Sequence, residues 1–552
     1  MSTAHDLNLP QTWLIAKQFL GENGLTSWGK HALYALPLGY AAYVACLWFY
    51  RLYLHPLSGI PGPKLAGKVI LNPHSVELSS ITYWPEVYYD VIQGGKFFLA
   101  IDEMHRKYGP IIRINPDEVH FDDPDIIDTV FPGAGRRTNK PKVVVVDFSV
   151  GAPNSMVATV DHDMHRRRRN TVNAFFSTAS IRRLEPIMKE HIDKMLILVS
   201  EYGKAGGPIQ LHHLFKACTS DVITMYAFGD SFHFLDQPNL GRPYFEATDL
   251  FFGLTHIFGH ATWLAVIIQS LPIWAIGFFI PSLRELWTKQ SWWVDRVREI
   301  RSSPNPERIK STIFEGIINS SLPDEDKTDA RLAAEAQLVV FAGEGTTAHT
   351  LTAATYELLA HPEDLQKVRE ELAQAIPDAN ETPSFSQVDS LPYLNAVINE
   401  VIRLHPGVMN RQPRISPDLP IAYHDKHTGR DYVLPPGTLT TMSPLTTHMN
   451  ADVFEDPYEF RPQRWIDNPK IARAFLGFSR GSRSCLGMNL ARKEMAMVLA
   501  ALFRKYDVYR GQAGHTLELY DTQRARDIDP NSDFIIPIPA PGSKGLRVRI
   551  RG

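Results

Sequence analysis

Hydrophobic and polar positions alternate along residues 110–122 (PIIRINPDEVHFD), and this period of two predicts short strands flanked by turns. Residues 413–443 show the same short alternation between turn residues, which predicts further small sheets. Neither region is long enough to build a large sheet. The strands are therefore expected to be minor parts of the fold.

A helical pattern covers most of the sequence from Arg331 to Leu404. It is broken at His361-Pro362 and again by the polar segment 377–392, because proline and clustered polar residues end helices. No change of composition divides the chain after residue 70. We therefore expect a mostly α fold with small β-sheets in one large domain, residues 71–552.

The run Ala32–Tyr50 contains no charged residue and has about the length that crosses a bilayer. It predicts one N-terminal transmembrane helix at 32–50, after an N-terminal lumenal segment at 1–31. A cleavable signal peptide is the alternative, but no convincing small-residue cleavage site precedes Arg51. The prolines and glycines that follow predict a stiff hinge at 51–70. Basic residues after the run favour a cytosolic catalytic domain.

Composition narrows the classes of function. The chain has 552 residues and a formal charge of −3, which argues against nucleic acid as a partner. Its three cysteines cannot form a disulfide framework, and neither Cys46 nor Cys218 has metal-ligand neighbours at zinc spacing. A reducing compartment is expected for the catalytic part.

Cys485 lies in a glycine-rich turn between Gly481 and Gly487, with Arg483 two residues before it. The stretch 488–506 lacks Gly and Pro and predicts a helix, whose N-terminal N–H groups would favour the thiolate of a sulfur placed there. A thiolate with an arginine beside it suits a haem iron that carries anionic propionates. On the cysteine alone, a buried structural thiol in a loop is the alternative.

The segment from Phe478 to Gly487 has the pattern F-x-x-G-x-R-x-C-x-G, and it resembles the haem-thiolate signature of the cytochrome P450 family. The resemblance implies the mostly α fold of that family and haem b with an axial thiolate from Cys485. It also implies electrons from NADPH through NADPH-cytochrome P450 reductase, dioxygen as co-substrate and an endoplasmic reticulum membrane location. The predicted cofactor contacts within this segment are Phe478, Gly481, Arg483 and Gly487.

The segment Phe341-Ala-Gly-Glu-Gly-Thr-Thr347 interrupts a predicted helix with two glycines. Alone it indicates a kink or a close helix contact. With Cys485 it resembles the family's oxygen-activating groove, which implies catalytic positions at Gly343, Glu344 and Thr346. The family's acid position holds Gly345, and Glu344 cannot simply replace it because residues two apart point to nearly opposite sides of a helix.

Further arginines match the family's propionate contacts. His165 and Arg169 lie four residues apart in a predicted basic helix, for which a solvated basic face is the alternative, and Arg414 falls where another contact is expected. The resemblance also implies a buried structural network of Glu400, Arg403 and Arg464.

The resemblance implies monooxygenation of a lipophilic small molecule, in a pocket with candidate walls at 143–156, 337–347 and 407–412. The hinge HPLSGIPGPKLAG and the following MHRKYGPIIRINPDEVHF resemble fungal enzymes that act on terpenes and other secondary metabolites. A terpenoid or related metabolite is therefore the expected substrate. The alternatives are a haem-thiolate isomerase or dehydratase that uses no dioxygen, and a non-catalytic haem-binding protein.

Overall fold

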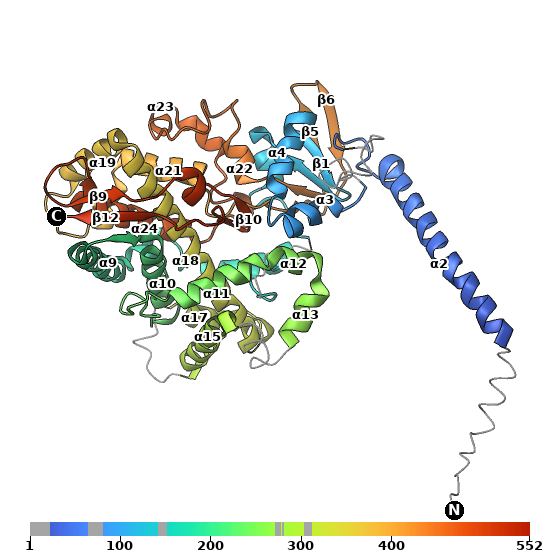
Figure 1. Ribbon diagram of the computed structural model, residues 1–552, viewed down its shortest axis with the longest axis horizontal. Coiled ribbons are helices and arrows are strands. Elements are labelled where there is room, and N and C mark those ends of the chain that lie inside the picture. Colours follow the sequence, from blue (N-terminus) through green and yellow to red (C-terminus); the bar gives the residue numbers. More distant parts are fainter. Residues whose placement is uncertain (1–21, 64–80, 142–151, 271–277, 279–280, 303–311) are drawn as a thin grey trace, which may run out of the picture.

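The computed structural model describes residues 22–63, 81–141, 152–270, 278, 281–302 and 312–552. At the centre of its main body lies the long helix α18 (Asp329–Ala360), against which pack α10 (Leu211–Phe228), α15 (Arg284–Ser302) and α24 (Met488–Lys505) (Figure 1). The large hydrophobic cluster includes residues from all four helices. The mostly helical fold predicted from the sequence is confirmed.

Local sequence accounts for the ends of the central helices. The Thr328 side chain accepts a hydrogen bond from the Arg331 N–H and caps the start of α18. The helix ends before His361, and Pro362 begins the next helix, because proline suits a first turn where no N–H partner is needed. Beyond this predicted break lie α19 (Pro362–Ala375), α20 (Phe385–Asp389) and α21 (Pro392–Leu404).

Small sheets lie beside the helices, as the alternating segments predict. The first has the order β1-β2-β7-β4, with β2 parallel to β7 and the other pairs antiparallel. The second has the order β3-β12-β9-β8, with β8 parallel to β9. Two hairpins, β5-β6 and β10-β11, complete the described strands. The strands are β1 (Ile111–Asn115), β2 (Glu118–Phe121), β3 (Pro208–Gln210), β4 (Arg414–Ile415), β5 (Ile421–Asp425), β6 (Arg430–Leu434), β7 (Leu439–Thr441), β8 (Asp507–Val508), β9 (Thr516–Leu519), β10 (Ser532–Phe534), β11 (Ile536–Ile538) and β12 (Arg547–Arg551).

The other helical elements surround this frame. They are α3 (Trp84–Val87), η3 (Tyr88–Ile92), α4 (Phe97–Tyr108), η4 (Pro124–Ile126), α5 (Ile127–Val130), α7 (His162–Asn173), α8 (Thr178–Arg182), α9 (Glu185–Ala205), α11 (Arg242–Gly253), α12 (Thr255–His260), α13 (Thr262–Ser270), η5 (Pro281–Leu283), α17 (Ile313–Ile318), η6 (Asp324–Lys327), α22 (Pro444–His448), α23 (Arg464–Asp467), η7 (Pro469–Ala474), η8 (Gly481–Arg483) and η9 (Arg524–Ile528).

The predicted transmembrane helix at 32–50 is not supported. These residues fall in α2 (Glu22–Phe49) and at the start of η1 (Tyr50–Leu54), and α2 projects from the main body (Figure 1). No helix in the described ranges combines the length and the hydropathy that a membrane crossing requires. Four tyrosines, Pro37 and Gly39 make the run less apolar than its lack of charge suggests.

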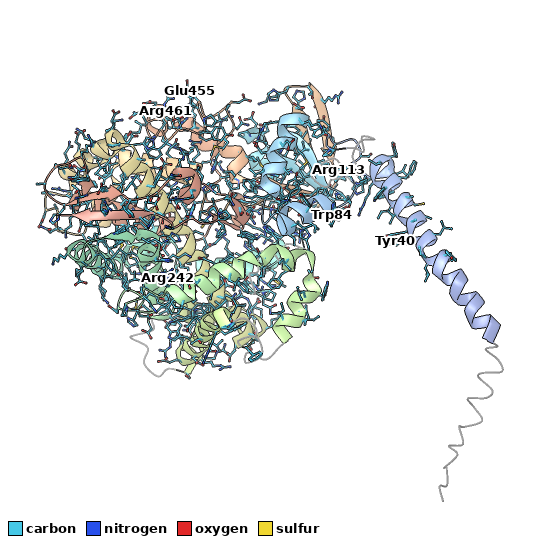
Figure 2. The ribbon with its side chains drawn as sticks, in the orientation of Figure 1. Tyr40, Trp84, Arg113, Arg242, Glu455 and Arg461 are labelled. Carbon is cyan, nitrogen blue, oxygen red and sulfur yellow. The ribbon has the colours of Figure 1, made fainter. Side chains whose placement is uncertain are left out.

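Arg113 joins the end of α2 to the main body (Figure 2). Its buried guanidinium donates to the Arg51 carbonyl at 2.7 Å and to the Pro116 carbonyl at 2.7 Å, and its backbone N–H donates to the Pro61 carbonyl. The first part of the predicted hinge is therefore fixed against β1. Residues 1–21 of the predicted N-terminal segment and 64–70 of the predicted hinge lie outside the described residues.

Candidate functional site

The Cys485 loop runs from η8 to the start of α24. The Cys485 N–H donates to the Phe478 carbonyl at 2.8 Å, which closes the turn. Burial raises the pKa of the Cys485 thiol, although the Gly487 N–H and the Arg169 charge favour the thiolate. The same side chain is nevertheless exposed. The sulfur is thus partly enclosed by protein and still accessible, so it can bind a metal ion.

Gly481 is required by the packing of the loop. Its φ is +70°, and a Cβ at this position would lie 2.3 Å from the Pro132 carbonyl oxygen and 2.4 Å from that of Phe131. Gly481 thus permits a close approach to the backbone of Phe131 and Pro132. By contrast, nothing lies within 4 Å of a Cβ built at Gly487. The predicted contacts of both glycines with a cofactor stay predictions.

Arg483 is buried and bonded only to neutral groups among the described residues. Its guanidinium donates to three carbonyl oxygens: Thr138 at 3.2 Å, Thr159 at 2.7 Å and Val160 at 2.8 Å. Burial lowers the pKa of Arg483 to about 10. A buried cation that lacks a counter-ion is costly, so this geometry favours an anionic ligand beside it.

Arg414 and Arg169 lie on other elements and are likewise bonded to neutral groups among the described residues. Arg414 donates to Ser479 Oγ at 3.1 Å, and Arg169 of α7 donates to the Ser484 carbonyl at 2.6 Å. Burial lowers the pKa of Arg414 to about 9, with the Arg483 charge adding to the effect. No carboxylate of the described residues lies within ion-pair distance of either guanidinium. The structure thus gathers three predicted arginines around one loop.

His165 lies one helical turn before Arg169 and is buried on the inner face of α7. Burial, together with the Arg483 and Arg169 charges, lowers the pKa of His165 to about 2. The imidazole is therefore neutral at physiological pH and offers a hydrogen bond rather than a charge. His165 therefore does not belong to the solvated basic face that was the alternative interpretation of this helix.

Thr346 lies on the side of α18 where the helix is least covered. Its hydroxyl donates to the Ala342 carbonyl at 2.9 Å, and Ala342 is exposed although α18 runs through the centre of the body. Gly407, just after α21, packs against this turn, because a Cβ there would lie 3.1 Å from the Thr346 carbonyl oxygen. Nothing lies within 4 Å of a Cβ built at Gly345.

Gly343 and Glu344 are turned toward other helices. A Cβ on Gly343 would lie 2.6 Å from Ile223 of α10, so this glycine permits a close helix contact, which was the alternative to a catalytic role. The Glu344 carboxylate accepts from Ser220 at 3.0 Å and from Tyr244 at 3.2 Å. Burial raises the pKa of Glu344 to about 7. The Glu344 carboxylate therefore does not take part in the hydrogen bond of the Thr346 hydroxyl. This agrees with the expectation that residues two apart on a helix point to nearly opposite sides.

The predicted network around Glu400 is present. Arg403 makes two bonds to the Glu400 carboxylate, at 2.9 and 2.8 Å, and Arg464 donates to it at 3.1 Å. Trp465 adds an indole N–H bond at 2.8 Å, a partner that the sequence did not indicate. This network joins α21 to α23, and the loss of one partner would leave a buried charge unpaired.

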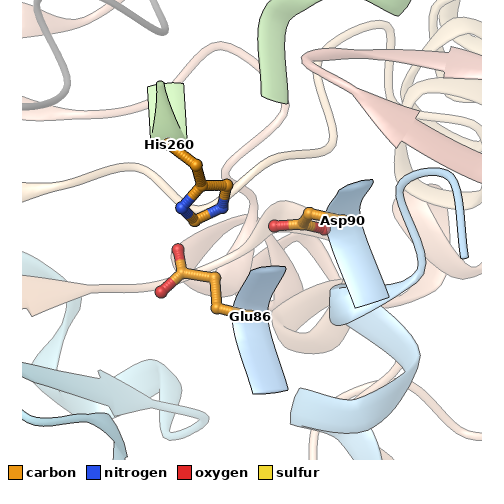
Figure 3. A group of neighbouring side chains, drawn as sticks. All are labelled: Glu86, Asp90 and His260. Atoms are coloured by element: carbon orange, nitrogen blue, oxygen red, sulfur yellow. The ribbon is translucent and has the colours of Figure 1, made fainter. Parts of the chain in front are cut away.

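A pocket of about 70 Å³ between α3, η3, α12 and the residues after α21 was not predicted from the sequence. Glu86, Asp90 and His260 face one another there, with ligand atoms within 4.8 Å (Figure 3). Arg411 pairs with Glu86 at 2.6 Å, so an arginine already supplies the positive charge that a metal would bring. These residues come from distant segments, and no local motif marks them. Residues 143–151 of the predicted pocket wall 143–156 lie outside the described residues.

Comparisons with known proteins agree with this geometry. The family model described as Cytochrome P450 matches residues 82–523. The cytochrome P450 monooxygenase tpcC of Cochliobolus heterostrophus is 36% identical over 524 residues, covering 94% of this chain and 97% of that protein. The cytochrome P450 monooxygenase orf6 of Eupenicillium brefeldianum is 34% identical over 94% of this chain and 100% of its own length. The cytochrome P450 monooxygenase TRI4 of Trichoderma arundinaceum is 34% identical over 90% and 92%.

Proposed function

The chain belongs to the cytochrome P450 family and is a monooxygenase, and we propose that it oxidises a lipophilic terpenoid or related secondary metabolite. The proposed electron source is NADPH, through NADPH-cytochrome P450 reductase. One atom of dioxygen enters the substrate and the other leaves as water.

The observation that carries the proposal is the chemistry around the Cys485 loop. Two buried arginines, Arg414 and Arg483, and the half-buried Arg169 have no carboxylate partner among the described residues. The accessible Cys485 thiol follows Ser484, to which Arg169 is bonded. These donors fit haem b, since its two propionates supply the missing anions and its iron takes the thiolate. Bound there, thiolate-ligated haem iron supplies the activation of dioxygen.

The protein's own residues then supply position and protons. Arg169, Arg414 and Arg483 would fix the propionates by charge-assisted hydrogen bonds, and Cys485 would supply the thiolate that ligates the iron. Thr346 would hold a proton on its hydroxyl at the turn of α18 where Ala342 is exposed, since its Oγ1 already donates to the Ala342 carbonyl. The apolar and small side chains of 337–347 and 407–412 would orient a lipophilic substrate and exclude bulk water.

The assignment of the ligand is tested by the spectrum of the reduced, carbon-monoxide-bound protein. We expect a strongly red-shifted Soret band, because the axial ligand is a thiolate, and we expect Cys485→Ser to abolish it. Cys46→Ser is the matched control, since Cys46 is an exposed thiol on α2. A Cys485→Ser protein that kept the band would overturn the assignment.

The reaction class and the substrate need turnover. The purified protein would be combined with reductase, NADPH and candidate terpenoids under labelled dioxygen, and one labelled oxygen atom per product is expected. Product formed at the full rate without dioxygen would indicate an isomerase or dehydratase instead. A metabolite comparison after co-expression with a reductase in a terpene-producing host identifies the substrate class, and unchanged metabolites there would count against the terpenoid proposal.

A further inference from the structure

A pocket of about 200 Å³ lies between α18, the first turns of α10 and β11, and we call it the α10–α18 pocket. Its volume is many times the ~10–15 Å³ that one water molecule needs, but it is below the ~300–1,000 Å³ of sites for drug-sized ligands. Its described wall residues include neither a residue of the Cys485 loop nor any of the three arginines around that loop. The pocket therefore suits a small ligand that does not compete with haem.

Basic side chains form one part of the wall. His212, His213 and Lys216 come from the first turns of α10, and His349 comes from α18. His213 Nδ1 and His349 Nε2 are buried and make no hydrogen bond with any described residue. Buried polar atoms are nearly always satisfied, so these two nitrogens indicate a partner that the described residues do not supply.

The start of α10 adds backbone donors to the same wall. Gln210, the N-cap residue, also lines the pocket, and it makes no side-chain cap bond. The Leu211 N–H donates to the Leu546 carbonyl, but no side chain of the N-cap residue satisfies the N–H groups that follow. Uncapped N–H groups and the positive end of the helix dipole favour an anion at this end of α10.

The electric field at the imidazoles has the sign that attracts an anion. Burial, with the Lys216 and Arg242 charges adding to it, lowers the pKa of His213 to about 4. Burial, with the His405 and Lys216 charges adding to it, lowers the pKa of His349 to about 3. Lys216 contributes to both shifts, so its positive charge is felt on both sides of the pocket.

The two carboxylates of the wall are already paired with cations. Asp249 accepts from the Lys216 ammonium at 2.8 Å, and its side chain is 46% exposed to solvent. Asp527 is buried and accepts from Arg526 at 2.8 Å and from the Ser543 hydroxyl at 2.7 Å. An ammonium group has three donors, so the bond to Asp249 leaves Lys216 able to donate to a ligand as well.

Another part of the wall is apolar. It contains Ile528 of η9 and Ile536, Pro537 and Ile538 of β11. An inorganic anion would leave this apolar surface in contact with water. A carboxylate that carries a small hydrocarbon group would cover it, and removing apolar surface from water is favourable.

We propose that the α10–α18 pocket binds a small organic carboxylate, with its charged group at Lys216, His213 and His349 and its hydrocarbon group against β11. A neutral imidazole can donate one hydrogen bond, and a carboxylate is an acceptor only, so the partners match. This site goes beyond the proposed oxidation and does not depend on it.

Binding is tested on the native, haem-containing protein by equilibrium dialysis with labelled benzoate. Benzamide, a neutral molecule of nearly the same shape, tests the charge, and acetate tests the hydrocarbon group. We expect one benzoate per chain, held at least about tenfold more tightly than benzamide, as for a hydrogen bond to a charged group, and more tightly than acetate. Benzamide bound as tightly as benzoate, or no saturable benzoate binding in the millimolar range, would overturn the proposal.

Two variants locate the bound benzoate. Lys216→Met should weaken it by at least about tenfold, whereas Lys204→Met, at an exposed position on α9, should leave it unchanged. Gly345→Leu should abolish binding, because Gly345 lies in the wall and a Cβ there meets nothing within 4 Å. Benzoate binding that survives both Lys216→Met and Gly345→Leu would belong to another site and would contradict the assignment.

The two proposals fail in different ways. If the native protein lacks the red-shifted Soret band or forms no oxygenated product, the proposed function is wrong, whatever the benzoate result. If the native protein oxidises its substrate and binds no benzoate, the proposed function stands and the carboxylate site is wrong.

Discussion

Glu344 is a buried carboxyl whose protonation is linked to folding. Only 4% of the residue is exposed, and burial raises its pKa from 4.5 to about 7 against the smaller opposing effects of Lys216, Ser220 and Tyr244. A carboxyl whose pKa is raised on folding binds its proton more tightly in the native state. Its stabilising contribution is therefore full below pH 4.5 and is lost as the pH rises to about 7.

Replacing Glu344 by glutamine removes this titration while retaining an acceptor oxygen for Ser220 or Tyr244. At about 1.36 kcal/mol per pKa unit, Glu344→Gln should gain stability over the native protein by about 3 kcal/mol at pH 7, and by almost nothing at pH 4.5. Urea unfolding across this pH range measures the difference. Glu381→Gln, at an exposed position, is the control. A pH-independent difference for Glu344→Gln would show that its pKa is not raised.

The sequence predicted part of this residue chemistry. Helix geometry alone indicates that Glu344 cannot act from the missing acid position, and the structure agrees. Its partners Ser220 and Tyr244 lie 124 and 100 residues away, so no local pattern could name them. The Cys485 loop is different, because its residue types lie together at fixed spacing and are visible in one short segment.

Two glycines of α18, Gly343 and Gly345, are separated by one residue and have opposite surroundings. A Cβ on Gly343 would meet Ile223 of α10 at 2.6 Å, whereas a Cβ on Gly345 would meet nothing within 4 Å. We expect Gly343→Ala to destabilise the protein by about 1–3 kcal/mol through overpacking. Gly345→Ala, the matched variant, should stabilise it by about 0.5–1 kcal/mol, because alanine favours the helix.

Denaturant unfolding of both variants measures the contrast. Equal effects of the two substitutions would mean that α10 and α18 are not packed as closely as the structure shows.

At the scale of elements, the strongest sequence signals were those with a local cause. The break at His361-Pro362 and the helix after Gly487 follow from proline and glycine chemistry, and the structure places both within a residue of the prediction. The polar segment 377–392 was predicted as a break, but it also contains α20, where Ser384 and Gln387 form a capping box. Such a short helix carries too little periodicity to be seen.

At the scale of the whole molecule, the candidate site joins segments that are remote in sequence. Arg169 bonds to Ser484 across 315 residues, and Arg483 to Thr138 across 345. Only the family resemblance predicted that Arg169 and Arg483 act at one site, and it named neither Ser484 nor Thr138. The pocket lined by His212, Asp249 and His349 had no such guide, since these residues belong to three helices, α10, α11 and α18, whose packing is set by the whole core.

The attachment of α2 leads to a prediction about truncation. Side chains of α2 such as Tyr40, 70% exposed, lie clear of the main body (Figure 2), whereas Leu57 and Ile60 are buried in a cluster with Ile111 of β1. A chain that starts at Tyr50 should keep its unfolding free energy within about 0.5 kcal/mol, as for changes at exposed positions.

A chain that starts at residue 62 should lose about 3–6 kcal/mol, because each of the two buried side chains contributes about 1.5–3 kcal/mol. It also removes the Arg51 and Pro61 carbonyls that Arg113 bonds. Arg113 would then keep a buried charge with fewer acceptors, so the loss is expected at the upper end of that range. Urea unfolding of the two truncated proteins and of the full chain measures these differences in unfolding free energy. Equal stability of the two truncations would show that residues 51–61 do not hold the main body together.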